Sequence, residues 1–279
     1  LAPLGMTRST FERPLPDRFR EAMSRSYDAG SEPPLPEDRL DHEEPAGDPS
    51  GHLAATVADM TRFMLAHLAN GRLGNDSLFG AATARLMHAP AFEPLPGAHP
   101  IALGFFRLDR NGHPILGHAG DIEGFHADLQ LLPERGVGWF IAVNASGVRR
   151  GLLGAGSLLR PAFAQAFMDR YFPAPPEAEP PTAPTAKEHA RLVAGEYWMS
   201  RRPSGDFMEA ISLLGRQQLG LEITANEDGT IVTPGFLDFE RGRPQTWRQV
   251  GPFQWREVGG RGWLDMKVEN GRVVGLLPR

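Results

Sequence analysis

Two spacings of apolar residues alternate along the chain and predict helices in some segments and strands in others. Where apolar residues recur every three or four positions, a helix with one apolar face is expected. The helices predicted in this way cover residues 57–68, 81–88 and 152–171. Thr56 and Asp59 resemble a capping box at the start of the first helix, and Asn70-Gly71 provides a left-handed stop. Pro161 is expected to break or kink the third helix.

Between the second and third helices the period changes to two, which is typical of strands. The strands predicted there cover residues 101–108, 113–118, 124–132 and 137–144. Turn-forming residues join the outer pairs of strands, and a loop at 119–123 joins the middle two. In the third strand Leu129 faces one way, while the polar His126 and Asp128 face the other. We therefore predict an antiparallel meander with one buried face, on which the third helix can pack.

A proline-rich segment separates this region from a second one. Six prolines fall within residues 173–186, which favours an extended linker. The rest of the chain, residues 187–279, is strand-like almost throughout, with turn signals such as Asn270-Gly271. The strands predicted there cover residues 192–200, 207–213, 219–225, 230–233, 245–250, 253–258, 263–269 and 272–277. Four tryptophans supply bulk for the core of a small barrel or sandwich.

Composition narrows the classes of protein that fit. The net charge of −5 argues against a nucleic-acid-binding surface. No apolar run approaches the ~20 residues that a membrane-spanning helix needs. The absence of cysteine excludes disulfides, thiolate metal sites and a cysteine nucleophile. Leu1 is not a natural start, and residues 272–279 stop within a predicted strand, so we expect the chain to be a fragment.

Several short motifs follow one another in an informative order. Along the chain they are Pro3-Leu4-Gly5-Met6-Thr7, Pro45-Ala46-Gly47, a helix with Thr56, Asp59 and Phe63, Leu103-Gly104-Phe105, His118-Ala119-Gly120, Gly124-Phe125, Leu132-Pro133-Glu134 and Asn144. Their order and spacing over residues 1–172 resemble the C-terminal half of the serine β-lactamase and penicillin-binding-protein family, in the branch of class C β-lactamases, D-specific peptidases and related esterases. The resemblance implies a partial α+β domain, an antiparallel sheet packed with helices, and leaves residues 187–279 as an accessory, all-β, barrel-like domain.

The family forms an acyl-enzyme with three motifs, which are Ser-x-x-Lys, Tyr-x-Asn or Ser-x-Asn, and Lys/His-x-Gly. The sequence His118-Ala119-Gly120 matches the third motif. The resemblance implies that His118 contacts the substrate or tunes proton transfer, and that Gly120 lets the substrate backbone approach. It also implies that the backbone N–H of Asp121 completes an oxyanion hole. The alternative interpretation is that His118 merely ends a strand and Gly120 merely turns the chain.

The other two motifs are absent from this chain. The only lysines, Lys187 and Lys267, have no serine three residues earlier, and no tyrosine or serine is followed by asparagine two residues later. In the family both motifs lie before the segment with which this chain begins. We therefore expect the chain alone to be inactive and its partner to be the missing N-terminal half of the catalytic domain.

The resemblance thus implies part of a serine hydrolase that acts on an amide, β-lactam or ester in a small-molecule or peptide-like substrate. No cofactor is implied. Relatives in this family are often exported, and only this favours a periplasmic or secreted location. A non-catalytic binding module, in which the second domain recognises the ligand, is the alternative. The nearby His113, His118 and His126 lack metal-site spacing, so no metal site is predicted. His67 and His88 are expected to be surface or partly buried residues.

Overall fold

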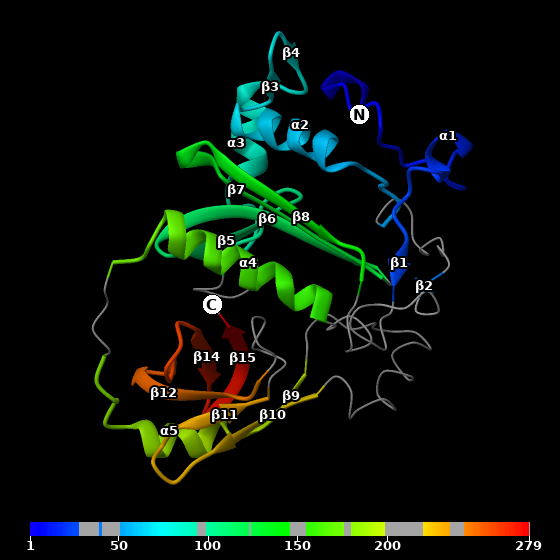
Figure 1. Ribbon diagram of the computed structural model, residues 1–279. Coiled ribbons are helices and arrows are strands. Elements are labelled where there is room, and N and C mark those ends of the chain that lie inside the picture. The colour runs from blue at the N-terminus through cyan, green and yellow to red at the C-terminus, as the bar shows by residue number, and fades with distance from the viewer. Residues whose placement is uncertain are drawn as a thin grey trace. The chain divides into compact units, whose positions relative to one another are not determined.

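The chain folds into two compact units, Leu1–Pro175 and Pro176–Arg279, each with its own sheet (Figure 1). The computed structural model describes residues 1–27, 39–40, 51–93, 99–122, 124–145, 155–175, 180–198, 220–234 and 243–278. Within those residues, no helix is long and apolar enough to cross a membrane.

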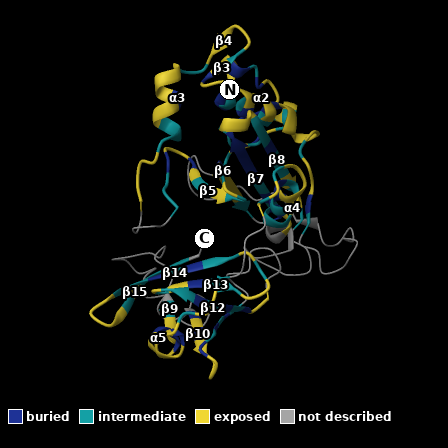
Figure 2. Cartoon of the chain, turned by 90° about the vertical axis from the view of Figure 1, so that its left-hand side faces the viewer, coloured by how far each residue is buried: buried dark blue, intermediate teal, exposed yellow. Residues whose placement is uncertain are grey.

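The main sheet of the first unit has four strands in the order in which they occur along the chain. The strands are β5 (Phe106–Arg110), β6 (His113–Ile122), β7 (Phe125–Leu132) and β8 (Val137–Val143). Every neighbouring pair is antiparallel, which confirms the predicted meander. Asn111 and Gly112 both have positive φ angles in the turn between β5 and β6, as a two-residue hairpin loop requires. β7 is the most buried strand (Figure 2).

Helices cover both faces of this sheet, so the prediction of one buried face was wrong. α2 (Val57–Leu68) packs on the apolar face, where Met64 joins Leu116, Leu129 and Leu131 in one core cluster. α4 (Ala155–Tyr171) covers the other face (Figure 1). The polar residues of β7 that were expected to face solvent lie beneath α4. Period-two alternation cannot distinguish an exposed polar face from one that is buried and hydrogen-bonded.

The predicted helices form, with differences at their ends. α2 begins after Thr56, whose hydroxyl accepts a hydrogen bond from the Asp59 N–H at 3.2 Å. The Asp59 carboxylate does not complete a capping box, because it accepts hydrogen bonds from the Arg8 N–H and the Ser9 hydroxyl at 2.9 and 2.7 Å. Asp59 therefore ties the N-terminal segment to α2. α3 spans Ala81–His88 as predicted.

Pro161 was expected to break or kink this helix, and α4 continues through it without a break. A proline removes one backbone donor, yet the packing of Ala164 and Met168 against Ile115, Leu132 and Trp139 stabilises the helix on the sheet. The smaller elements of this unit are η1 (Ala2–Leu4), α1 (Asp17–Arg20), the pair β1 (Ser26–Tyr27) and β2 (Arg39–Leu40), the pair β3 (Arg72–Leu73) and β4 (Asp76–Ser77), and η3 (Pro133–Arg135).

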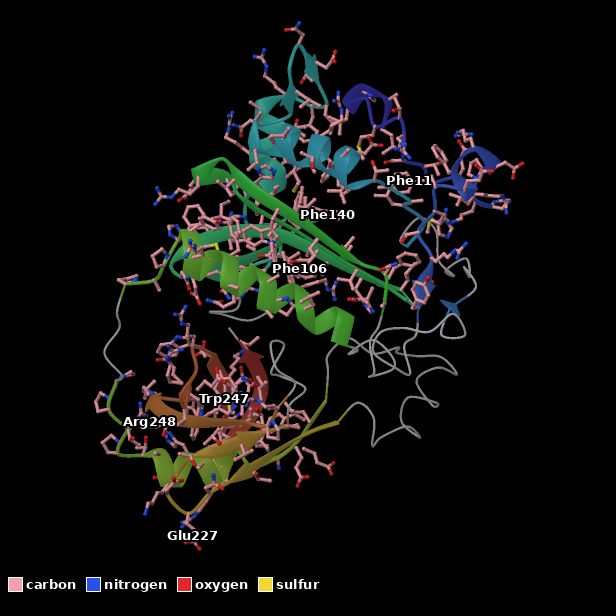
Figure 3. All side chains as sticks on the ribbon, in the orientation of Figure 1. Phe11, Phe106, Phe140, Glu227, Trp247 and Arg248 are labelled. Atoms are coloured by element: carbon pink, nitrogen blue, oxygen red, sulfur yellow. The ribbon has the colours of Figure 1, made fainter. Side chains whose placement is uncertain are left out.

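The second unit is a curled antiparallel sheet of seven strands, consecutive in order. They are β9 (Gly195–Trp198), β10 (Gly220–Ala225), β11 (Ile231–Thr233), β12 (Gln245–Gly251), β13 (Gln254–Glu257), β14 (Trp263–Glu269) and β15 (Arg272–Pro278). The helix α5 (Ala186–Val193), which the sequence analysis did not predict, packs Ala190 and Val193 against Trp247 and Trp255. Trp247 is labelled among the side chains of this core in Figure 3. The predicted strand at 207–213 lies outside the described residues.

Candidate active site

The three residues singled out from the sequence lie on one strand. β6 runs on to Ile122, so the loop expected at 119–123 is mostly strand, and the prediction of a loop there was wrong. Gly120 pairs in register with Ala127, and Asp121 pairs with His126. Ile122 pairs with Phe125, so the hairpin needs only two connecting residues. Gly120 therefore lies within a strand and does not turn the chain.

The end of β6 extends beyond its neighbour β5. The last pairing between the two strands joins Gly117 to Phe106. Before Phe106 the chain doubles back, because Ile101 bridges to Phe106 and Gly104 takes a left-handed φ of 79°. On this side of β6, none of the described residues pairs with residues 118–122. That segment is an open strand edge, which is the kind of edge that can take up an extended peptide-like molecule.

His118 is exposed beside this open edge. Its ring lies 5.5 Å from the ring of Phe106, measured between centroids. Phe106 is itself 46% exposed and is labelled in Figure 3. The imidazole ring of His118 and the apolar ring of Phe106 thus lie together at the first residue of β5. Both can be reached by a molecule bound along the edge.

Gly120 has open space where other residues carry a side chain. A Cβ atom placed on it would meet no atom of the described residues within 4 Å. Gly117, three residues earlier, differs, because a Cβ there would come within 3.0 Å of the Leu129 carbonyl oxygen. Internal packing therefore explains a glycine at position 117 and does not explain one at position 120. The room at Gly120 is available to a molecule that approaches the strand from outside.

The backbone of Asp121 faces the open edge. In antiparallel strands the N–H and C=O of one residue point to the same neighbour, and successive residues alternate. Ile122 and Phe125 close a two-residue hairpin, so the backbone groups of Ile122, and hence of Gly120, point toward β7. The N–H and C=O of Asp121 consequently point away from β7, toward the side on which β5 has ended.

The side chain of Asp121 enters a buried polar cluster beneath α4. Its Oδ1 accepts hydrogen bonds from Nδ1 of His126 and from Nη2 of Arg160, each at 2.6 Å. A carboxylate can only accept, so the proton between Asp121 and His126 sits on Nδ1. Partial burial by itself would raise the pKa of Asp121, but the hydrogen bonds from His126 and Arg160 outweigh it and hold the pKa below its usual value. The carboxylate is therefore ionised and faces away from the open edge.

Arg160 bonds to both strands of the candidate site, and the sequence analysis did not single it out. Its side chain is 7% exposed, and Nη1 donates to the carbonyl oxygens of Gly120 and Ala127 at 3.1 and 2.6 Å. One guanidinium thus holds a carboxylate on β6 and one carbonyl on each of two strands. An arginine within an otherwise apolar helical stretch was a signal that it is buried and paired. Its partners, 33 to 40 residues away along the chain, could not be read from spacing.

Asp128 and Gln130 extend the polar cluster along β7. Nε2 of Gln130 donates to Oδ2 of Asp128 at 2.8 Å. Burial raises the pKa of Asp128 above its ordinary value, although Gln130, Arg160 and Arg110 act in the opposite direction. The two aspartates on this face are therefore shifted in opposite senses. The difference follows from Asp121 receiving direct bonds from two cationic or ionisable donors.

Comparison with known protein families identifies the family to which the first unit is similar. The sequence profile described as Beta-lactamase matches residues 1–158, which is more than half of the chain. The chain belongs to the beta-lactamase family. This is a family of serine hydrolases, and the match confirms the resemblance drawn from the short motifs. A search of curated protein sequences finds no match to this chain.

Solved structures show the beta-lactamase fold at low sequence identity. A crystal structure of SurE matches with a TM-score of 0.52 and 18% identity, and covers 99% of this chain and 59% of SurE. The octameric penicillin-binding protein homologue from Pyrococcus abyssi matches with a TM-score of 0.48 and 15% identity. The match covers 100% of this chain and 56% of the homologue's chain. The D-amino acid amidase from Ochrobactrum anthropi SV3 matches with a TM-score of 0.40 and 20% identity. The match covers 52% of this chain and 41% of the amidase chain. The chain thus spans roughly half of the length of these proteins.

The three histidines of β6 and β7 in this beta-lactamase family member do not come together at one point. His113 contacts the ring of Phe172, His118 that of Phe106, and His126 bonds to Asp121. In the described part of the chain, no three His, Asp or Glu side chains are grouped so that they could hold a metal ion. His67 was expected to be a surface or partly buried residue, but it is fully buried, with 2% of its surface exposed.

His67 forms a buried pair with His88. Nδ1 of His67 lies 3.0 Å from Nε2 of His88, so one ring nitrogen donates and the other accepts. Burial, with a smaller contribution from His88, lowers the pKa of His67 from 6.5 to about 4. The pair is neutral at physiological pH and joins α2 to α3. The ring of Phe105 contacts both histidines, and we expect the pair to act on stability.

Proposed function

We propose that this chain supplies the third-motif strand of a serine hydrolase that works through an acyl-enzyme on an amide, β-lactam or ester. His118 contacts the substrate or tunes proton transfer, Gly120 admits the substrate backbone, and the Asp121 N–H polarises the carbonyl under attack. The whole protein's activity and substrate are part of this proposal.

The observation that carries the proposal is the open edge of β6. Three independent features coincide on residues 118–121, namely an exposed imidazole, a glycine with outward room, and a backbone N–H that faces away from β7. An oxyanion site requires such a donor, fixed before the reaction and aimed at the developing charge. The family membership of residues 1–158 supports the same conclusion.

The chemistry needs a nucleophile that this chain does not contain. A serine oxygen bonds to the substrate carbonyl carbon as its proton passes to a general base, and the carbon–nitrogen or carbon–oxygen bond then breaks. The leaving group takes up that proton, and water releases the acyl group by the same route in reverse. We propose that the serine belongs to a Ser-x-x-Lys sequence N-terminal to Leu1, in a longer protein that contains this chain. No cofactor takes part in these steps.

The test compares the chain with that longer protein. A fluorophosphonate or penicillin probe should label the longer protein at the Ser-x-x-Lys serine, and substitution of that serine by alanine should abolish labelling. The chain of 279 residues should show neither labelling nor ester hydrolysis above a serine-free control. A longer protein without Ser-x-x-Lys, or one that takes no label, would contradict the proposal and favour a non-catalytic binding module.

Gly120→Ala provides a matched variant for the same experiment. The added methyl group meets no atom of the described chain, so the free energy of unfolding should change by less than about 1 kcal/mol. The rate of labelling should nevertheless fall, because the methyl group occupies the space through which the substrate backbone approaches. Equal rates of labelling for both proteins would show that substrate does not pass over this glycine.

A further inference from the structure

Behind the open edge, a single buried arginine bonds to the peptide group whose N–H is proposed to act on the substrate. That peptide consists of the Gly120 carbonyl and the Asp121 N–H. Nη1 of Arg160 donates to this carbonyl at 3.1 Å, and Nη2 donates to the carboxylate of Asp121 at 2.6 Å. Arg160 thus contacts both residues that form the peptide group, and the edge remains free.

The geometry of the peptide makes this contact directional. A trans peptide is planar, and its C=O and N–H point in opposite directions. A donor that fixes the carbonyl on one side therefore fixes the N–H on the other. Nη1 of Arg160 also donates to the Ala127 carbonyl of β7 at 2.6 Å, which places the Gly120 carbonyl on the β7 side. The Asp121 N–H is then directed at the open edge.

The charge of the cluster suits such a role. Arg160 carries a permanent positive charge that is almost fully buried, and the Asp121 carboxylate balances it. A guanidinium offers several donors in a rigid planar group, so it can hold three acceptors at fixed angles, which a lysine cannot. His126, 2% exposed, holds the same carboxylate oxygen from a second direction.

We propose that Arg160 is a positioning residue of this site, which fixes the Gly120–Asp121 peptide so that the Asp121 N–H faces the carbonyl oxygen of the substrate. The inference rests on the proposed function, because it assigns a task to the Asp121 N–H. It adds a residue on α4, far from the Lys/His-x-Gly motif along the chain. Arg160 does not touch the substrate and acts only through the peptide.

The first part of the test uses the chain itself and needs no activity. Arg160→Gln is compared with Gln165→Ala, a control on the same helix. Gln165 bonds to Asn111 and Asp169 at 3.3 and 3.0 Å, so its loss weakens the anchoring of α4 without touching the edge. Hydrogen exchange by NMR should accelerate about tenfold or more at the amides of Gly120 and Ala127 in Arg160→Gln, and by less than about threefold in the control. Equal exchange in both variants would overturn the proposal.

The second part uses the longer protein with its serine. In Arg160→Gln, kcat should fall by about 10- to 100-fold, less than the loss of a whole oxyanion donor, while KM changes by less than about threefold. Affinity for a boronic acid, whose adduct places an oxygen in the oxyanion site, should fall with kcat. Arg160→Lys should recover only part of the rate, and methylguanidinium should partly rescue Arg160→Ala.

The outcomes separate the two proposals. If the wild-type longer protein takes no label, the proposed function fails, and the role of Arg160 fails with it. If the wild type is labelled and Arg160→Gln reacts at the wild-type rate, only the role of Arg160 is overturned. A loss of thermal stability with unchanged kcat and boronate affinity would show that Arg160 only anchors α4.

Discussion

The two faces of the four-stranded sheet use the same strands for different purposes. Toward α2, the side chains of β6 and β7 form an apolar cluster that includes Leu116 and Leu131, and the one pair of titratable rings described nearby is kept neutral. Toward α4, charged and polar side chains are buried and bonded to one another around Arg160. Both faces contribute apolar packing, because Ile115, Leu132 and Trp139 pack against α4, but only the α4 face also bonds to backbone carbonyls near the edge.

The difference shows how a strand can be both stable and accessible at one end. Hydrophobic packing is non-directional, so it holds β6 in the core without fixing how any one peptide group is aimed. Hydrogen bonds to a buried guanidinium are directional, and they act where none of the described residues pairs with β6 on the β5 side. If this division is correct, substitutions on the two faces should have separable effects on stability and on activity.

The largest effect is expected in the apolar face. Leu131→Ala removes a side chain with no exposed surface from the cluster under α2 and should lower the free energy of unfolding by about 2–5 kcal/mol. Urea denaturation followed by circular dichroism measures this change. The control is Leu159→Ala, where a half-exposed leucine on α4 should cost less than about 1 kcal/mol. Similar losses in both variants would mean that the α2 face is not the main core.

The next prediction concerns His118, whose side chain lies at the open edge. In the longer protein, His118→Ala should lower kcat/KM by about 10- to 1000-fold, because one positioned proton-transfer or electrostatic group is lost. The exposed ring leaves stability nearly unchanged. His113→Ala, on the same strand but beside Phe172, should change kcat/KM by less than about threefold. Full activity in His118→Ala would remove the role assigned to this side chain.

The buried histidine pair makes the α2 side sensitive to acid. In the unfolded chain His67 takes up a proton near pH 6.5, whereas in the folded chain it does so only near pH 4. Between these values the unfolded state binds more protons, so stability is complete above pH 6.5 and declines toward pH 4. The expected loss at pH 4.5 is about 2–3 kcal/mol relative to pH 7.5. His67→Gln should flatten this dependence, and an unchanged slope would contradict it.

The smallest effects distinguish the two aspartates beneath α4. Asp121 has a lowered pKa, so its ionised form stabilises the fold above its ordinary pKa, and Asp121→Asn should cost about 1–3 kcal/mol at pH 7. Asp128 has a raised pKa, so ionisation at neutral pH opposes folding, and Asp128→Asn should cost less than about 1 kcal/mol or stabilise. Urea denaturation at pH 7 tests both, and the reverse order would show that Asp128 is the main partner of Arg160.

Much of the fold follows from local sequence signals. Period-two alternation and the Asn111-Gly112 turn predicted the antiparallel meander, and the strands β10 to β15 lie within one or two residues of their predicted ranges. The length of β6 was not predictable in this way, because Ala119 and Gly120 are poor strand formers that are held by pairing with Asp128 and Ala127. Tertiary pairing overrode local preference there.

The candidate site also contains residues that a local motif predicted and residues that only tertiary packing brings together. His118, Gly120 and Asp121 could be named because a short motif carries them, and their assigned roles stay predictions. Arg160 could not be named as their partner, since its three acceptors come together only when α4 docks on the sheet. The burial of His67 was missed for a related reason, because α3 and the ring of Phe105 cover it from distant parts of the chain.

The tight reversal before β5 has a consequence for how this site could diversify. The left-handed turn at Gly104 ends the pairing of β5 with β6 at Gly117, and so it decides how many residues of β6 are left uncovered. Each residue added to the start of β5 would cover one more position, beginning with His118. The length of ligand that the edge accommodates is therefore adjustable by insertions or deletions in the 101–105 segment. Selection or design could change the length of the open edge there and leave β6 itself unaltered.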